Sequence, residues 1–519
     1  MKRFLGLAII SLFVASCHKD TEIATSSEGL SNNQPAQNEY AISEEEALSN
    51  LEEFMHEFDA SGTRSVGPRI VQSITPIKYN SFVTRNNTSV DCENLLYVAN
   101  FDNNQGYAIL AGDSRISDPV IAVVDNGSLS DATVYSAIEL MNMERRIFDG
   151  YPTTGPGFYT TPETGDEIFM NPNTVTLYDE TVGDTLVGNF LLDDIGSETD
   201  EIIITPLQSP ANNSYDSGIL TSSLCVSYAM NEISNVESLR NDIIGGDYGG
   251  GGGSTPRQWT KDVYTSWTTV ESVSPMLTQF TGWHQRSPFN DLYPERRKGL
   301  LFGTKRKALA GCFPLAIAKI LTHFEYPGSF TYNGYRIDWD ALKEDFNSPT
   351  GSKSAAYLLH CISSGCNSWY FYQGTFTFPS KATDFMESVG LYGAHSHKYD
   401  YQLVKDMLDA GRPLIIYSVP GIDITSSHSW NIDGYYVKER QKTTETYLGS
   451  ELIKTSDPIT ETCKMVHCDF GWEGGSNGYY VSGVFKLNDS RIEFDAGSET
   501  DDDTNYNNML KVITYNIPQ

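Results

Sequence analysis

The sequence has little positive charge. Its 519 residues include 36 lysines and arginines against 67 aspartates and glutamates, a formal net charge of -31. This balance argues against a nucleic-acid partner, because phosphate backbones need clustered basic side chains. The deficit is concentrated in residues 1–250, whose net charge is -26, whereas residues 251–519 carry only -5. The two halves of the chain therefore differ strongly in net charge, which suggests that they belong to different domains.

Cysteine is also scarce, with 8 residues in the whole chain, far fewer than in a disulfide-stapled scaffold. Cys361 and Cys366, or Cys463 and Cys468, could pair, but neither pair has the C-x-x-C spacing and partner ligands of a metal site. If Cys17 carries lipid, an odd number remains, so at least one thiol stays unpaired. We expect mostly reduced, buried cysteines and one reactive thiol.

Long apolar runs are missing beyond the N-terminus, so we expect no transmembrane domain. Residues 1–17, MKRFLGLAIISLFVASC, have a basic start, a short apolar segment and small residues before Cys17. This resembles a bacterial lipoprotein signal with Cys17 as the lipidated residue; an ordinary secretory signal is the alternative. The polar residues 18–40 predict a flexible tether, and CHKDTE at its start is similar to surface-export signals of some Bacteroidota lipoproteins.

Residues 41–150 predict a small α+β domain. Its first segment, ISEEEALSNLEEFMHEF, has apolar residues at helical spacing after Ser43, a plausible N-cap. The segments LLYVANF, GYAILAG and PVIAVVD follow, separated by Asn, Gly and Asp turns, and are typical of strands.

Residues 151–245 are acidic and rich in turn residues, with one possible helix around 225–233 and no role that the sequence assigns. The glycine run at 246–256 then predicts a flexible, protease-accessible linker, because glycine loses more backbone entropy on folding than any other residue. We place a domain boundary there.

The segment ALAGCFPLAIAKIL contains the most informative cysteine. A helix is expected from about residue 313 to 324, and Pro314 suits its first turn. Cys312 therefore lies at or beside the N-cap, where the helix dipole and unpaired N–H groups stabilise a thiolate. The alternative is a small buried cysteine packed behind a glycine.

A thiolate nucleophile needs a proton-transfer partner, and His428 has the most suitable context. LIIYSVPG reads as a strand, and SWNIDGYYV after His428 reads as a second strand that runs to a turn at Asp433–Gly434. Further on, KMVHCDFGWEGGSNGYYVSGVF predicts a strand with Asp469, then Phe470 and Trp472, a glycine turn and a closing strand. Asp469 is a candidate to orient the imidazole.

Four segments in this order resemble the streptopain family of papain-like cysteine peptidases, which are made as zymogens. They are WHQRSPFN with Gln285, the Gly-Cys helix start at Cys312, HSWNIDGY from His428 and HCDFGWEGG with Asp469. The stretch YVANFDNNQGYAILAGDSR also resembles the family's prodomain. The resemblance implies an α+β catalytic domain at 257–519, with a helical half and an antiparallel sheet half.

The resemblance also implies roles for these residues. Cys312 is the nucleophile, His428 the general acid and base, Asp469 the group that holds the imidazole, and Gln285 the oxyanion donor together with the Cys312 N–H. Phe470 and Trp472 support the site, and no metal or organic cofactor is needed.

The chain departs from the family pattern at two places. Asp469 and Phe470 stand where the family usually has Asn and Trp, and Lys319 replaces a residue that is often amide-bearing.

The function expected is that of an exported cysteine endopeptidase, an outer-membrane or cell-surface lipoprotein whose mature catalytic domain can be released. Its partners would be protein or peptide substrates, its own prodomain as inhibitor, and a membrane reached only through the lipid anchor. Activating cuts are expected near Arg257 or Lys261, which lie in the exposed segment after the linker. The alternatives are a papain-like acyltransferase, or a catalytically weak or inactive surface lipoprotein that binds ligands. The alternative to the zymogen hypothesis is that residues 41–245 form a permanent binding domain.

Overall fold

The computed structural model describes residues 40–58, 69–79, 81–83, 89–138, short strands between 158 and 206, and residues 217–244, 258–297, 305–370, 374–419, 428–448, 450–485 and 509–518. The signal segment, nearly all of the tether and the glycine linker lie outside these residues. In the part of the chain that is described, none of the helices combines the length and the apolar character needed to span a bilayer.

The N-terminal part forms the α+β unit that its sequence predicts. Helix α1 (Glu44–Phe58) begins after Ser43, whose Oγ accepts a hydrogen bond from the Glu46 N–H at 3.2 Å. The expected strands are present as β4 (Leu96–Phe101), β5 (Tyr107–Ala111) and β6 (Val120–Val124). Together with β1 (Val71–Ile77) they pair antiparallel in the order β1-β4-β5-β6.

This N-terminal sheet continues directly into the sheet of the C-terminal part. Strand β6 pairs antiparallel with β26 (Gly478–Val481), with Tyr479 opposite Val123. A Cβ atom at Gly478 would lie 2.3 Å from the Val123 carbonyl oxygen, so this junction requires a glycine. The resulting sheet therefore joins two segments more than 300 residues apart in the sequence.

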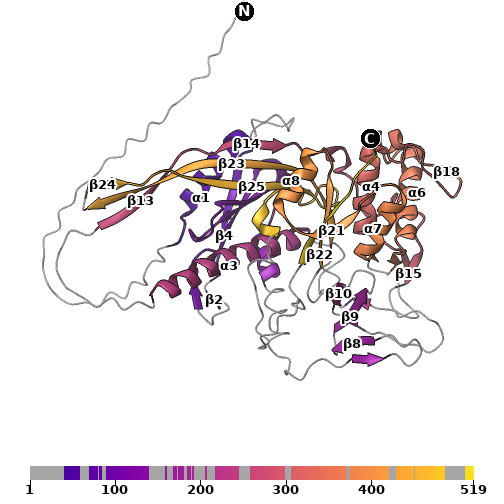
Figure 1. The fold of residues 1–519 in the computed structure, drawn as a ribbon, viewed down its shortest axis with the longest axis horizontal. Coiled ribbons are helices and arrows are strands. Elements are labelled where there is room, and N and C mark those ends of the chain that lie inside the picture. The colour runs from indigo at the N-terminus through magenta and orange to yellow at the C-terminus, as the bar shows by residue number, and fades with distance from the viewer. Residues whose placement is uncertain are drawn as a thin grey trace, which may run out of the picture. The chain divides into compact units, whose positions relative to one another are not determined.

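Beyond β26 the sheet has the order β25-β23-β22-β27-β21. The bounds of these strands are β25 Ile459–Asp469, β23 Ser429–Leu448, β22 Leu414–Val419, β27 Met509–Thr514 and β21 His395–Lys398. Figure 1 shows the long strands β23 and β25 side by side, and β13 (Gln258–Tyr264), β14 (Thr268–Val273) and β24 (Glu451–Thr455) also pair with β23.

The sequence predicts a turn at Asp433–Gly434, and this prediction is wrong. Strand β23 continues through both residues, and its pairing with β25 shifts register between Ile432 and Gly434, as at a bulge. Glycine suits the place because a Cβ there would lie 2.8 Å from the Val273 carbonyl oxygen of β14. At this bulge the Asp433 side chain accepts a hydrogen bond from the Leu277 N–H at 2.8 Å.

Helices form the other half of the C-terminal part. Helix α4 (Cys312–Phe324) contacts α5 (Trp339–Glu344), α6 (Pro349–Gly365) and α7 (Pro379–Ser388). Figure 1 shows α4, α6 and α7 together. Helix α4 also packs on β23 and β22, and α8 (Tyr401–Asp409) covers the same two strands. This mixture of a helical half and an antiparallel sheet half confirms the expected α+β class.

The possible helix around residues 225–233 is part of α3 (Ser217–Ile244). Its Tyr228 hydroxyl donates to Asp118 of the N-terminal part at 2.5 Å, and the ring packs against Gly483 of the C-terminal part. Helix α3 thus bridges the two parts.

The remaining short elements are strands, and their bounds are β2 Ser81–Val83, β3 Ser89–Asp91, β7 Phe158–Thr160, β8 Glu167–Asn171, β9 Thr174–Asp179, β10 Asp184–Gly188, β11 Phe190–Leu191, β12 Thr205–Pro206, β15 Glu295–Arg297, β16 Lys305–Lys307, β17 Thr331–Tyr332, β18 Tyr335–Arg336, β19 Trp369–Tyr370 and β20 Thr375–Phe376.

Candidate active site

Cys312 is the first residue of α4, as the sequence predicts. Gly311 precedes it with φ +89°, a conformation that favours glycine, and a Cβ there would lie 3.2 Å from atoms of Pro314 and Thr375. The turn therefore presents the thiol at the helix N-terminus, where N–H groups without intrahelical partners and the helix dipole favour negative charge. Cys312 is partly exposed, as an attacking group must be.

The other cysteines have less reactive surroundings. Every cysteine that the structure describes is unpaired, and most are buried. Burial raises the pKa of the Cys361 thiol to about 11 and raises the pKa values of Cys225, Cys366 and Cys468 further. These thiols therefore stay protonated and behave as small apolar side chains.

Gln285 is linked to the loop that precedes Cys312 by a main-chain hydrogen bond. Its carbonyl oxygen accepts a hydrogen bond from the Ala310 N–H at 2.8 Å, two residues before Cys312. The Gln285 side chain is half-buried. This contact anchors the segment that carries Gln285 beside the loop that leads into α4, the neighbourhood where an oxyanion donor is needed.

His428 is held beside the first turns of α4. Ser429, the next residue, pairs with Tyr417 of β22, whose ring centroid lies 5.3 Å from that of Phe313. The Asn431 side chain also donates to the Ala316 carbonyl oxygen at 3.2 Å. These contacts hold the strand that follows His428 against the first turns of α4, the helix that begins at Cys312, and no hydrogen bond joins His428 and Cys312 within the described residues.

The His428 ring is fixed by a main-chain oxygen. Its Nε2 lies 2.9 Å from the Phe470 carbonyl oxygen, and since a carbonyl only accepts, Nε2 carries the hydrogen and Nδ1 is left to take a proton from a thiol. Trp472 stacks on the ring with centroids 4.2 Å apart. Burial lowers the pKa of His428 to about 4, with the positive charge of Lys319 acting in the same direction.

Asp469 makes other contacts than the sequence leads us to expect. Its Oδ2 receives a hydrogen bond from the Lys319 ammonium at 2.7 Å, and its Oδ1 accepts from the Gly471 N–H and from Asn477. The imidazole contact expected of Asp469 is made instead by the carbonyl of its neighbour, Phe470. The physical reason is that the Asp469 carboxylate is already engaged by Lys319 of α4 and by two donors of its own loop, Gly471 and Asn477.

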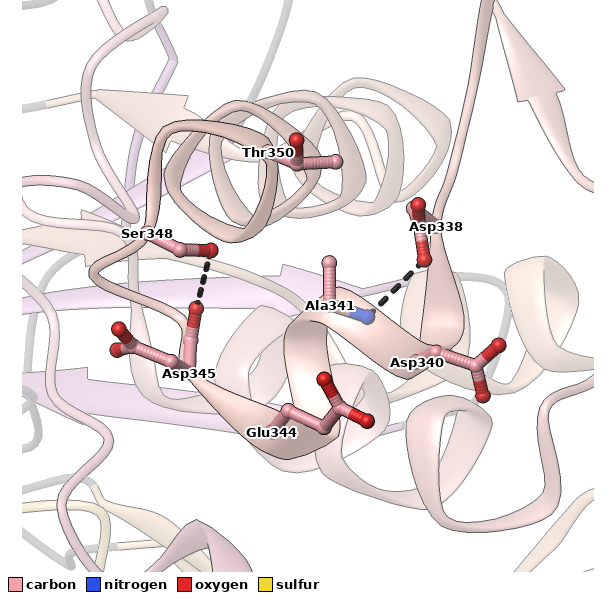
Figure 2. Close-up of a pocket in the computed structure, with 7 residues that line it drawn as sticks. All are labelled: Asp338, Asp340, Ala341, Glu344, Asp345, Ser348 and Thr350. Atoms are coloured by element: carbon pink, nitrogen blue, oxygen red, sulfur yellow. Dashed lines mark hydrogen bonds between the residues drawn. The ribbon is translucent and has the colours of Figure 1, made fainter.

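The hollow in Figure 2 lies elsewhere, at α5 and the start of α6. Two of its side chains serve the local fold: Asp338 caps α5 by accepting from the Ala341 N–H, and the Ser348 hydroxyl donates to the Asp345 carbonyl. The residues that line it are Asp338, Asp340, Ala341, Glu344, Asp345, Ser348 and Thr350. None of the expected site residues is among them, so this hollow is not the site that the sequence predicts.

Sequence reasoning missed three features of this region. The Phe470 carbonyl has no sequence signature, because every residue carries one. Lys319 had a signal that we did not use, since a lysine within an apolar helix needs a buried partner. His467 was noted only as part of a motif, yet its Nδ1 lies 2.5 Å from Asp433 and its Nε2 lies 3.3 Å from Asp125 of the N-terminal part.

Comparison with known proteins assigns both parts of the chain. Residues 283–480 match the family model of the peptidase C10 family, and this range includes Gln285, Cys312, His428 and Asp469. Residues 39–144 match the family model of the Spi protease inhibitor. None of the curated proteins matches the chain.

Proposed function

We propose that this protein is an exported cysteine endopeptidase made as an inactive zymogen. The support is that residues 283–480 match the model of the peptidase C10 family, the streptopain family, and that residues 39–144, ahead of them, match the model of the Spi protease inhibitor. The observation that carries this proposal is the partly exposed thiol of Cys312 at the start of α4, beside a histidine whose Nε2 is held by the Phe470 carbonyl. Such a pair is suited to nucleophilic attack on a peptide carbonyl.

In the proposed reaction Cys312 gives its proton to Nδ1 of His428 and attacks the peptide carbonyl carbon. The tetrahedral oxyanion is stabilised by the Gln285 side chain and the Cys312 N–H. His428 then returns the proton to the leaving amine, which departs and leaves a thioester. Water, activated by His428, hydrolyses the thioester and frees the acid product and the thiol.

The contacts between the two domains support the zymogen part of the proposal. Strand β6 extends the peptidase sheet at β26, and the buried Lys438 ammonium donates to the Phe54 carbonyl at the end of α1, at 2.7 Å. Asp125 reaches His467 across the same boundary. The inhibitor-like domain is therefore anchored to the peptidase sheet by main-chain and ionic contacts together.

The strand pairing also favours one of the two expected processing positions. Lys261 lies in β13, opposite Glu445 of β23, so a cut there would divide a strand that the peptidase sheet retains. Arg257 lies just outside the described residues, before that strand begins. We propose that processing occurs at Arg257 or within the glycine run before it.

The N-terminal sequence supports export and lipid attachment at Cys17, as an anchor for an outer-membrane or cell-surface protein. Globomycin, which blocks the lipoprotein signal peptidase, should cause the unprocessed form to accumulate in the producing cell. A Cys17→Ser variant should be cut elsewhere or not at all, and should lose its lipid-dependent partitioning into detergent.

Incubation of the protein without its signal with casein, with and without the thiol inhibitor E-64, tests the proposed function. We expect hydrolysis that E-64 abolishes, together with loss of the N-terminal half in the active form, as mass spectrometry would show. Faster incorporation of a labelled amine than hydrolysis would instead indicate an acyltransferase. A processed protein whose Cys312 resists iodoacetamide would indicate an inactive binding protein, and full activity in a chain that keeps residues 41–245 would overturn the zymogen reading.

A further inference from the structure

The two departures from the streptopain pattern, Lys319 and Asp469, touch each other. The Lys319 Nζ lies 2.7 Å from the Asp469 Oδ2, and the two side chains are 1 % and 2 % exposed. A lysine or an aspartate alone in such surroundings would be strongly unfavourable, because a buried charge needs a partner. Each departure is therefore tolerable only because the other is present.

The pair lies directly behind the atom that holds His428. Besides the lysine, Asp469 accepts from the Gly471 N–H at 3.1 Å and from the Asn477 side chain at 3.0 Å, while Asn477 accepts from the Phe470 N–H at 2.9 Å. These bonds fix two peptide groups: the one that carries the Phe470 carbonyl, through the Gly471 N–H, and the one before it, through the Phe470 N–H. That carbonyl then receives the Nε2 hydrogen of His428 at 2.9 Å.

Helix α4 is the support on which this loop rests. Lys319 reaches the loop from seven residues after the nucleophile, on the same helix. A Cβ at Gly471, whose φ is +74°, would lie 2.7 Å from the Leu315 side chain, so the loop packs tightly on α4. One helix thus supplies the thiol at its first residue and the cation that anchors the histidine's loop.

We propose that Lys319 and Asp469 act together as positioning residues of this peptidase: their ion pair orients the Phe470 carbonyl toward His428 and balances the charge that the imidazole experiences. The inference rests on the proposed peptidase function. It assigns to Asp469 an indirect role, through the main chain of the next residue, in place of direct contact with the imidazole.

The balance of charge gives the proposal a measurable signature. Among the described residues, the rings that stack on His428, those of Trp430, Phe470 and Trp472, are neutral, and the charge that acts on its imidazole is that of Lys319, whose partner is Asp469. Loss of the lysine alone leaves a net negative charge that favours imidazolium, and loss of the aspartate charge alone leaves a net positive charge that disfavours it. A pair that served only to hold the fold would not produce shifts of opposite sign.

The test compares Lys319→Gln, Asp469→Asn and the double variant, with Lys319→Arg as a variant that keeps the charge. We expect each single variant to lose about ten- to a hundredfold in kcat/KM and the double variant to recover most of that loss. The acidic limb of the kcat/KM pH profile, where His428 must lose its proton before it can accept one from the thiol, should move up by about one unit in Lys319→Gln and down by a similar amount in Asp469→Asn. The double variant and Lys319→Arg should remain near wild type.

A matched control is the exposed ion pair at the other end of α4, between Lys343 and Glu325, with a separation of 2.6 Å. Lys343→Gln should leave both kcat/KM and the pH profile unchanged. If Lys319→Gln does not fold, higher kcat/KM in the double variant than in Asp469→Asn, with the pH profile back near wild type, still supports the pair.

A second readout separates this proposal from the proposed function. NMR titration of His428 in the full chain carrying Cys312→Ala, with its resonance assigned by His428→Gln, requires no hydrolysis. Opposite shifts in the two single variants support the positioning pair even if the wild type hydrolyses no substrate. Equal titration midpoints in all variants, or additive losses of activity with no recovery in the double variant, would overturn it.

Discussion

His467 and Asp469 are buried, lie two residues apart on β25 and both engage charged partners, but those partners come from different parts of the chain. Asp469 pairs with Lys319, so both members belong to the peptidase domain. His467 pairs with Asp433 of the peptidase domain and with Asp125 of the inhibitor-like domain. In the proposed processing the first cluster would persist, whereas removal of the inhibitor-like domain would take Asp125 from the second.

The charge of His467 depends on both of its carboxylate partners. Burial by itself lowers the pKa of His467, but Asp433 and Asp125 more than offset this and raise it to about 10. His467 is therefore an imidazolium in the zymogen at neutral pH. Because a raised folded-state pKa stabilises the protein below the unfolded value of about 6.5, this contribution is complete in acid and disappears as pH rises through about 10.

The comparison indicates that two clusters on one strand have different roles. The Lys319–Asp469 pair positions the loop that holds His428, so its loss should lower stability and activity both before and after processing. The Asp125–His467 contact joins the domains, and its loss affects the zymogen first. The four predictions below test this difference in roles, beginning with the largest effect.

Cys312→Ala leaves both charge clusters in place and removes only the nucleophile. We expect casein hydrolysis to fall by about three orders of magnitude or more, because a nucleophile and its base act as a unit. If processing is self-catalysed, the variant should also persist at full length while the wild type matures. Circular dichroism and thermal unfolding should show an intact fold, and unchanged casein cleavage would refute the assignment of the nucleophile.

Asp469→Ala breaks the permanent cluster and leaves the Lys319 ammonium buried without its carboxylate. We expect a loss of about 3–5 kcal/mol in the free energy of unfolding, measured with denaturant in a Cys312→Ala background that prevents autolysis. Asp469→Asn should lose less, since its amide oxygen can still accept from Lys319. A loss below about 1 kcal/mol for Asp469→Ala would show that the pair is not the buried support described above.

Asp125→Asn breaks the contact between the domains, and its effect should depend on pH. At pH 7 we expect the full-length Cys312→Ala protein to lose about 1–3 kcal/mol of stability, since a hydrogen bond to a charged group is removed. The difference between the two proteins should narrow as pH rises from about 8 to above 10, where His467 loses its proton in the parent. Arg69 also forms an ion pair with Asp125, at 3.0 Å. Its contribution to the stability difference between the two proteins should not change over this pH range, because arginine stays protonated.

Thermal unfolding from pH 7 to 11 measures this effect, and faster maturation of active Asp125→Asn should accompany it. The processed enzyme lacks Asp125 altogether and serves as the reference. A stability difference that stays constant with pH would mean that His467 is not the group involved.

Trp472→Phe should have the smallest effect, because it touches neither ion pair. It reduces the aromatic surface stacked on His428 at 4.2 Å but keeps a ring there. Aromatic pairs contribute about 0.5–1.5 kcal/mol, so we expect kcat/KM to fall roughly two- to tenfold with no shift of the pH profile. A loss as large as that of Cys312→Ala would show that the indole has a direct role in the reaction.

Much of the local structure could be read from the sequence. Apolar runs between turn residues gave β4, β5 and β6, and helical periodicity after Ser43 gave α1, because these patterns express burial and capping within a few residues. The site residues were instead predicted from four ordered motifs that resemble those of the streptopain family. The error at Asp433–Gly434 arose because a glycine that signals a turn locally was required here by a neighbouring strand, β14.

What the sequence alone determined is therefore the list of chemical groups: a thiol at a helix start, a histidine at a strand start, and an acidic domain that resembles an inhibitor. Tertiary structure decided which groups meet. The partners of Asp469, His428 and His467 include Lys319, the Phe470 carbonyl and Asp125, up to 342 residues away. Such contacts depend on how helices and strands pack, and neither a main-chain oxygen nor a distant counter-charge leaves a local pattern in the sequence.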